Sequence, residues 1–363
     1  MQQIKKLFYR NGKSYFSYVM IPVLFLVLMA AFQLDLINTY WQTIILLSGI
    51  NGIVAMSLNL INGITGQSCL GQAGFMSIGA YVSAMCTKLV FDGFMTSGFS
   101  SYLFFIISLL IGGAAASLIG LLIGIPSLRL RGDYLAIITL GFSEIIRVAW
   151  RVIPPAGRAM GLNTIPKLST LPMVFISVVI VMLVLRNFTN SRFGRSCIAV
   201  RENELAGETM GINTTRIKVL AFVLSAFIAG VGGGLYAHMM TFINPDTFNQ
   251  IKSTDMVLYL YAGGVGSFSS ALLGATVFSF LPEVLRSLGE WRLVIYSLSL
   301  VLIMINRPKG IFGKHEFGFM RYGEPENIHM KAENSGILSS LFQKLAYRRR
   351  KAERAPAAGK GDQ

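Results

Sequence analysis

The sequence predicts an all-α integral membrane protein, and three observations support this fold class. The chain is 53% hydrophobic and only 13% charged, whereas soluble domains carry about 25% charged residues. Its mean hydropathy is +0.59. Apolar stretches of about 20 residues recur along it, the length of helix that crosses a hydrocarbon core of about 30 Å. Helices are expected because lipid offers no partner for exposed backbone groups, and a barrel would show shorter alternating segments.

About ten membrane-spanning helices are expected in a transmembrane domain covering 16–306, behind a basic N-terminus at 1–15. The first apolar run is interpreted as a retained helix rather than a cleaved signal peptide, because it lacks a clear A-x-A site and many spans follow it. The expected spans are 18–33, 41–62, 70–90, 101–125, 134–153, 171–186, 217–243, 254–266, 270–287 and 291–306.

The distribution of positive charge predicts the orientation. If every span crosses, the cytoplasmic segments hold four, two, six and twelve Lys and Arg residues, 24 together, and the external loops hold five. The positive-inside rule then places both termini in the cytoplasm. The net charge of +15 follows from these loops, so no nucleic-acid partner is expected. The basic tail 307–363 is expected to be cytoplasmic and partly disordered, with weak attraction to anionic lipid.

Glycines interrupt several of the expected spans. Glycine permits broken helices and close contact between helices. Gly63, Gly66 and Gly74 recur 200 positions later, at 263, 266 and 274. The match is either an internal repeat, which transporters often carry, or a chance result among 37 glycines. The candidates for helix breaks or for the lining of a pathway are Gly66, Gly71, Gln72, Gly74, Gly263, Gly264 and Gly266.

Charged residues lie inside the expected span 134–153. Glu144 and Arg147 are three residues apart and can pair on one helix face. A charge in hydrocarbon is costly, so both side chains must face a partner or water. Two interpretations remain open. The pair is either a polar patch near the external mouth of a pathway or an end-of-helix pair that reaches the membrane interface.

The sequence contains no recognisable catalytic or metal-binding motif. It has no Walker loop, no G-x-S-x-G and no H-E-x-x-H, and its cysteines and histidines lack metal-ligand spacing. No cofactor, metal or catalytic residue is therefore expected, and the chain is not expected to be an enzyme. The expected spans contain few acids, namely Glu144, Asp255 and Glu283. Uphill transport would therefore depend on an ATPase on another chain rather than on an ion gradient.

The segment 187–216 is the best candidate for contact with such a partner. A short amphipathic helix is expected over 197–210, with Gly211 at the position where helices commonly stop. One of residues 213–215 is expected to cap the next helix. Apolar residues among charged ones suit docking in a partner's groove. A solvated connector on the membrane surface remains the alternative.

Five stretches of the chain together resemble one family. They are RENELAGETMGINTTRIKVLAFVLSAFIAGVGGGLYA, SLNLINGITGQSCLGQAGFMSIGAY, LRLRGDYLAIITLGFSEIIRV, the run from NPDTF to YAGGVGSFSSALLGA, and RPKGIFG. These motifs resemble the Liv-type branched-chain amino acid permeases of bacterial ABC importers, over about residues 45–313. The family often has His where Gln72 stands and Leu-Ser where Ser68 and Cys69 stand. These departures leave the lining of the pathway and the substrate in question.

The resemblance implies a multi-pass permease subunit of the bacterial inner membrane, without an ATPase site of its own. The implied partners are a homologous permease subunit, two ABC ATPase subunits, an extracytoplasmic solute-binding protein and the lipid bilayer. A urea or short-chain amide permease of the same superfamily is the nearest alternative, and an ion-coupled secondary carrier is a more distant one. The residues expected to couple to the ATPase are Arg201, Glu202, Asn203, Glu204, Leu205, Ala206, Met210, Gly211 and Ile212.

Overall fold

The computed structural model describes most of the expected transmembrane domain. The described residues are 38–90, 99–127, 132–289, 291–307 and 310–313, with Met29, Ala30, Phe32, Leu34 and Glu316. The basic N-terminus, most of the first expected span and nearly all of the tail 307–363 lie outside them. The chain divides into two units, 1–320 and 321–363, and all the described residues belong to the first. The described part is helical apart from its connections and one isolated bridge, between Leu162 and Ile243.

The described helices lie where nine of the expected spans were placed. They are α2 (Thr39–Asn59) continued by the π-helix η1 (Leu60–Thr65), α3 (Gln72–Met85) continued by η2 (Cys86–Val90), α4 (Phe99–Ser127), α5 (Asp133–Val152), α6 (Leu171–Asn190), α7 (Arg192–Glu202), α8 (Glu204–Thr209), α9 (Thr214–Met240), α10 (Gln250–Gly263), α11 (Phe268–Val284) and α12 (Trp291–Asn306). Short 3₁₀ turns follow α5, α9 and α11. The all-helical fold class is therefore confirmed.

Five helical stretches in the described part are long and apolar enough to cross a membrane. They are Thr39–Thr65, Ser100–Ser127, Leu171–Asn190, Thr214–Met240 and Phe268–Leu288. Shorter helices such as α3 and α10 pack against these stretches. The number of ten spans stays a prediction, because length and apolarity alone do not show which of the shorter helices cross.

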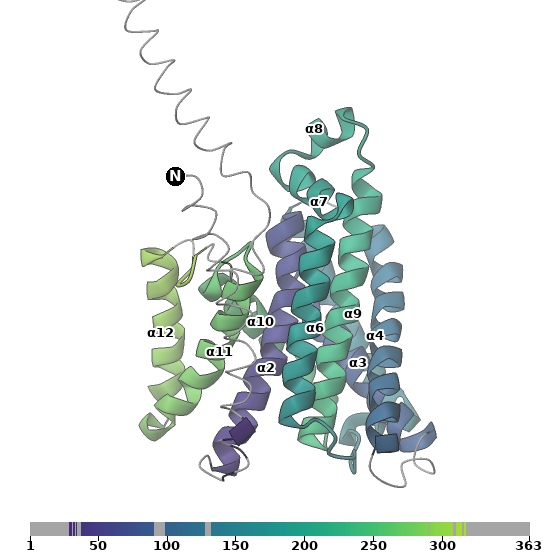
Figure 1. The fold of residues 1–363 in the computed structure, drawn as a ribbon, viewed down its shortest axis with the longest axis vertical. Helices are drawn as coiled ribbons and strands as arrows, with labels where there is room; N and C mark the ends of the chain where they lie inside the picture. The colour runs from purple at the N-terminus through teal and green to yellow at the C-terminus, as the bar shows by residue number, and fades with distance from the viewer. Residues whose placement is uncertain are drawn as a thin grey trace, which may run out of the picture. The chain divides into compact units, whose positions relative to one another are not determined.

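Helix α9 is the centre of the packing, because it contacts α2, α3 and α4 (Figure 1). Glycines allow the closest of these approaches. A Cβ atom at Gly79 of α3 would collide with the backbone of Gly230 of α9. A Cβ atom at Gly233 of α9 would collide with the backbone of Met76 of α3. Small residues let helix backbones approach each other in this way, so α3 and α9 are joined by direct backbone contact.

Helices α7 and α8 project at one end of α6 and α9 (Figure 1). The expectation of one helix over 197–210 was wrong, because the chain breaks at Asn203. This residue is extended, and its side chain accepts a hydrogen bond from the backbone N–H of Ala206, so it caps α8. Asparagine favours such caps over helix interiors. The expected stop is confirmed by Gly211, whose φ is +81°, and Asn213 caps α9.

Residues that follow α12 return to the break between α10 and α11. The backbone N–H of Ile311 donates to the carbonyl of Ala262 (2.8 Å). The carboxyl of Glu316 accepts from the backbone N–H of Phe268 (2.9 Å) and from the hydroxyl of Ser269 (3.0 Å), and so caps α11. Burial raises the pKa of Glu316 to about 6.

Candidate functional site

Two groups of candidate residues lie at opposite ends of the helices. The α7–α8 segment lies where α6 ends and α9 begins (Figure 1). The charged residues of α5 contact Asp246, which follows the other end of α9. Helix α9 has 27 residues, and at 1.5 Å per residue it is about 40 Å long. The two groups are therefore separated by about the thickness of a membrane.

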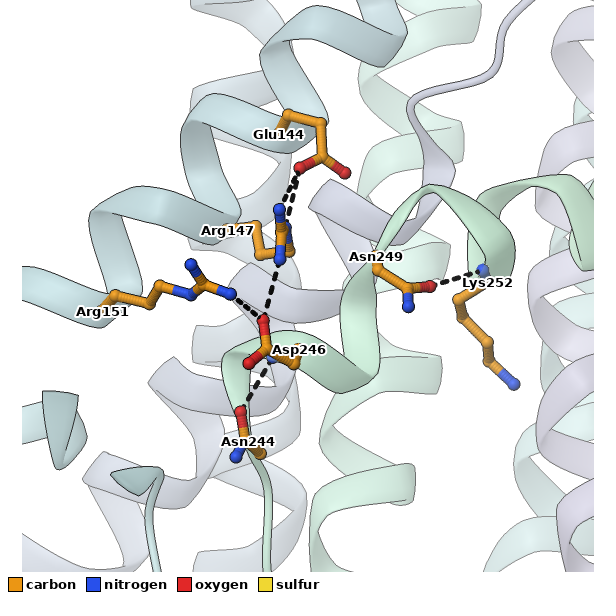
Figure 2. Close-up of polar contacts among 7 residues, drawn as sticks. All are labelled: Glu144, Arg147, Arg151, Asn244, Asp246, Asn249 and Lys252. Carbon is orange, nitrogen blue, oxygen red and sulfur yellow. Dashed lines mark hydrogen bonds and ion pairs between the residues drawn. The ribbon is translucent and has the colours of Figure 1, made fainter. Parts of the chain in front are cut away.

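Glu144 and Arg147 form an ion pair, and both belong to a larger charged network. Arg147 Nε donates to Glu144 Oε2 (2.7 Å), and Arg147 Nη1 donates to Asp246 Oδ1 (2.8 Å). Arg151 pairs with the same carboxylate (Figure 2). Asn244 orients the turn before α10 by accepting a hydrogen bond from the backbone N–H of Asp246 (2.9 Å). Two arginines of α5 therefore share one acid from the α9–α10 connection.

Asp246 was not among the candidate residues expected from the sequence. The hydrogen bond from the Arg151 guanidinium, with that from Arg147, lowers the pKa of the Asp246 carboxyl from its ordinary value, so this acid is ionised at neutral pH. Its side chain is 55% exposed, and solvent therefore weakens each attraction. A signal was present, because arginines in an apolar helix need a partner. Asp246 is the acid of the connection 241–249.

The two glycine-rich breaks contact each other near α7. Gly66, with φ of +73°, ends η1, and Gly266, with φ of +87°, lies between α10 and α11. Glycine adopts this left-handed conformation without steric cost. The backbone N–H of Gly266 donates to Asn59 Oδ1 (2.9 Å). A Cβ atom at Gly63 would lie 2.7 Å from the nitrogen of Gly266. The two breaks thus meet at one junction through Gly63 and Gly266, which are not a pair related by the offset of 200 residues, and the internal repeat stays a prediction.

The other glycine candidates lie at close contacts or in special backbone conformations. A Cβ atom at Gly71 or Gly74 would collide with α5, and one at Gly263 would collide with α11. Gly264 has a φ of +142°, a value that L side chains rarely adopt. These positions therefore have no room or no backbone freedom for a side chain, and their part in a pathway stays a prediction.

Gln72 is buried between three helices. Its Nε2 donates to Ser57 Oγ of α2 (2.6 Å) and to Ser225 Oγ of α9 (3.1 Å). Its Oε1 has no hydrogen-bond partner among the described residues. The side chain therefore joins α3 to its two neighbours inside the subunit, and its expected role at a pathway stays a prediction.

The α7–α8 segment exposes apolar side chains at the end of the molecule. Leu205 is 64% exposed and Met210 is 82% exposed. Ala206 is also exposed, and Ile212 is partly buried. Exposed large apolar residues at a projecting segment are typical of a surface that a partner covers. The exposure of Leu205 and Met210 is consistent with the expected contact segment, whose role in coupling stays a prediction.

A polar cavity of about 400 Å³ lies at the base of this segment. Charged side chains at its wall are paired within the chain, Glu202 with Arg201 (2.6 Å) and Glu204 with Lys218 (2.6 Å). The apolar residues, rather than these acids, are therefore the better candidates for contact with another protein. The residues that line the cavity are Thr65, Gly66, Gln67, Ser68, Gly132, Leu135, Val200, Arg201, Glu202, Asn203, Glu204 and Lys218.

Comparison with known proteins identifies the family. The family described as branched-chain amino acid transport system / permease component matches residues 40–305. The chain belongs to this family. The permease is similar to the high-affinity branched-chain amino acid transport system permease protein LivM of Salmonella typhimurium strain LT2, with 31% identity over 294 residues, 71% of this chain and 67% of that protein. LivM of Escherichia coli strain K12 has the same identity and coverage.

A second kind of relative matches a shorter part of the permease. The permease protein LivH of Escherichia coli strain K12 is 32% identical over 129 residues, which is 35% of this chain and 41% of that protein. No solved structure matches the permease. The resemblance of the sequence motifs to Liv-type permeases is thus confirmed.

Proposed function

We propose that this permease forms, together with a homologous permease subunit, the membrane path of an ABC importer for branched-chain amino acids. The names of the relatives support the solute class. The matches to both LivM and LivH support a pair of related subunits. In this proposal an extracytoplasmic protein delivers the solute, and two ATPase subunits on other chains hydrolyse the ATP.

The observation that carries the proposal is the projecting α7–α8 segment with exposed Leu205 and Met210. Residues 197–212 dock in a cleft of an ATPase subunit, and the two apolar side chains fill it. Interfaces usually depend on a few residues that become buried at their centre. The Lys and Arg residues of this loop support a cytoplasmic location, where ATP is available.

The charged network of Glu144, Arg147, Arg151 and Asp246 then lies at the external end. Charged groups at membrane depth face water or a partner rather than lipid. We assign this network to the external mouth of the path, where an amino acid with both charges enters. The glycine breaks beside α7 lie at the cytoplasmic end of the same subunit.

The test is transport by the purified system in liposomes. The permease is reconstituted with its sister subunit, its ATPase subunits and its binding protein, and uptake of radiolabelled leucine is measured. Uptake is expected to require internal ATP and external binding protein, and to be absent when the ATPase subunits are omitted. Uptake without ATPase subunits would indicate a secondary carrier. Uptake of urea or acetamide without uptake of leucine would indicate the alternative solute class.

A further inference from the structure

The Arg201 side chain of α7 contacts one glycine break and lies near the other. Its Nη1 donates to the carbonyl oxygen of Gly63 (2.9 Å), inside the π-helix that continues α2. Its stem lies against Gly66, where an added Cβ atom would be 2.5 Å from Arg201 Cγ. An added Cβ atom at Gly266 would be 3.7 Å from Nη1. The side chain thus connects the projecting segment to the α2–α3 break, which the hydrogen bond from Gly266 to Asn59 joins to the α10–α11 break.

The guanidinium is held in this position from its other edge. Arg201 Nε and Nη2 both donate to Glu202 Oε1, at 3.2 and 2.6 Å. A guanidinium presents five donors in one rigid plane, so it can serve two acceptors in fixed directions. Glu202 is 70% exposed, on the segment proposed to meet the ATPase. Contact of the ATPase with Glu202 would therefore act directly on the Arg201 guanidinium, which donates to the carbonyl of Gly63.

The surroundings allow the contacted elements to move. The polar cavity of about 400 Å³ is lined both by residues 65–68 and by residues 200–204, so part of the boundary between α7 and the α2–α3 break is not filled by side chains. Both breaks are irregular, one a π-helix ended by a left-handed glycine and the other a run with two positive-φ glycines. The hydrogen bond from Gly266 to Asn59 joins them. A force on one break therefore reaches the other.

We infer that Arg201 transmits the movement of the docked α7 to both glycine breaks, so that ATP hydrolysis changes the path. This inference rests on the proposed function. Arg201 is a positioning residue in this scheme, because it acts through the broken helices and touches no solute. Leu205 and Met210 bind the ATPase. Arg201 transmits the movement of the bound α7 to the backbone of the broken helices.

The test measures leucine uptake per ATP hydrolysed by the complete complex in liposomes. Arg201→Met keeps the stem and removes all donors. Arg201→Lys keeps the charge as a single point that cannot grip Gly63 and Glu202 together. Both variants keep Leu205 and Met210, the side chains proposed to fill the ATPase cleft, and the Arg201 side chain is only 29% exposed. Co-purification with the ATPase and the rate of ATP hydrolysis are therefore expected to fall much less than uptake per ATP. Uptake per ATP is expected to fall roughly tenfold for Arg201→Met, in the range of coupling changes seen for such networks, and less for Arg201→Lys.

The matched control is Arg195→Met. Arg195 lies on the same helix, is exposed, and donates to the carbonyl of Asn190 within the same loop (2.9 Å), so wild-type uptake per ATP is expected. Normal uptake per ATP in Arg201→Met would overturn the inference. Loss of ATPase binding, or loss of membrane insertion in both Arg201 variants, would assign a docking or folding role and overturn it as well. A wild-type complex without ATP-dependent uptake would instead refute the proposed function.

Discussion

Lys218 Nζ lies 2.6 Å from Glu204 Oε1 and joins the start of α9 to the start of α8. The Lys218 side chain is only 7% exposed, and that of Glu204 is 26% exposed. A second contact acts beside it, from the hydroxyl of Thr214 to Glu208 (2.9 Å). The acid at 204 was expected to belong to the contact with the ATPase. In the structure it fixes the position of α8 on the bundle, so its effect on docking would be indirect.

Substitutions at this pair should destabilise the protein asymmetrically. Glu204→Gln leaves a buried ammonium without its partner, a change that costs about 3 kcal/mol. Lys218→Met leaves a carboxylate that water reaches, so a smaller loss is expected. The double variant should recover part of the loss of Glu204→Gln. Thermal unfolding in detergent measures all three, with exposed Arg216→Gln as control. Equal losses from both single variants would contradict the burial argument.

The network on α5 predicts coupling between Glu144 and Arg147. Arg147→Gln removes the donor that both Glu144 and Asp246 accept from, so it should be more harmful than Glu144→Gln. The double variant should be less harmful than the sum of the single variants, by about 1 kcal/mol for partly exposed groups. A double-mutant cycle on unfolding and on uptake measures this term. Strictly additive effects would show that the interaction between Glu144 and Arg147 contributes nothing to stability or to uptake.

Substitutions at the glycine candidates should reduce uptake for two different physical reasons. A Cβ atom at Gly74 would lie 2.9 Å from Ser143 Cα, so even Gly74→Ala should disturb packing, and Gly74→Leu should abolish uptake. Gly266 has more space but a φ of +87°, so Gly266→Asn should retain more uptake than Gly266→Val, because asparagine tolerates left-handed backbone. Gly141→Leu, which meets open space, is the control. Equal uptake by all four variants would leave these glycines without special roles.

The docking proposal predicts that the exposed apolar residues Leu205, in α8, and Met210, directly after it, contribute more to ATPase binding than the acids of α8. Leu205→Ser and Met210→Ser should weaken co-purification with the ATPase by about tenfold or more, as central residues of interfaces do. Gly211→Val should also be severe, because a β-branched residue is strained at φ of +81°. Membrane insertion and the basal activity of the free ATPase should be unchanged. Normal complexes and normal uptake in all three variants would leave the segment as a solvated connector.

The cap of α11 predicts a pH-dependent stability. The pKa of Glu316 is about 6 in the folded protein, against an ordinary value of 4.5. The folded state therefore holds this proton more tightly, and the free energy of unfolding falls as the pH rises from about 4.5 to about 6. The upper limit of this loss is about 2 kcal/mol. Thermal midpoints of the wild type and of Glu316→Gln should differ in their slope over this range. A constant difference would refute the assignment.

Local patterns in the sequence were sufficient to locate the long apolar helices, and insufficient for the break between α7 and α8 and for the contacts between helices. Apolar length located the helices, and the asparagine at 213 was among the expected caps. The break at Asn203 was missed because an asparagine within an otherwise helical pattern does not by itself show whether it lies inside a helix or caps a new one. The pairings of Glu204 with Lys218 and of Arg147 with Asp246 were missed, because the two members of each pair lie on different elements. One sequence alone does not reveal such pairings.

The crossing of α3 and α9 limits how this subunit can change shape. Backbone touches backbone at Gly79 with Gly230 and at Met76 with Gly233, and a packed crossing of this kind does not deform gradually. We expect these two helices to move together as one block when the subunit changes conformation. Hinge movement is then left to the breaks on either side, at 60–71 and at 264–267. In this scheme α3 and α9 stay packed together, and the backbone changes only at the two glycine breaks, both of which lie at the end of the subunit that carries α7.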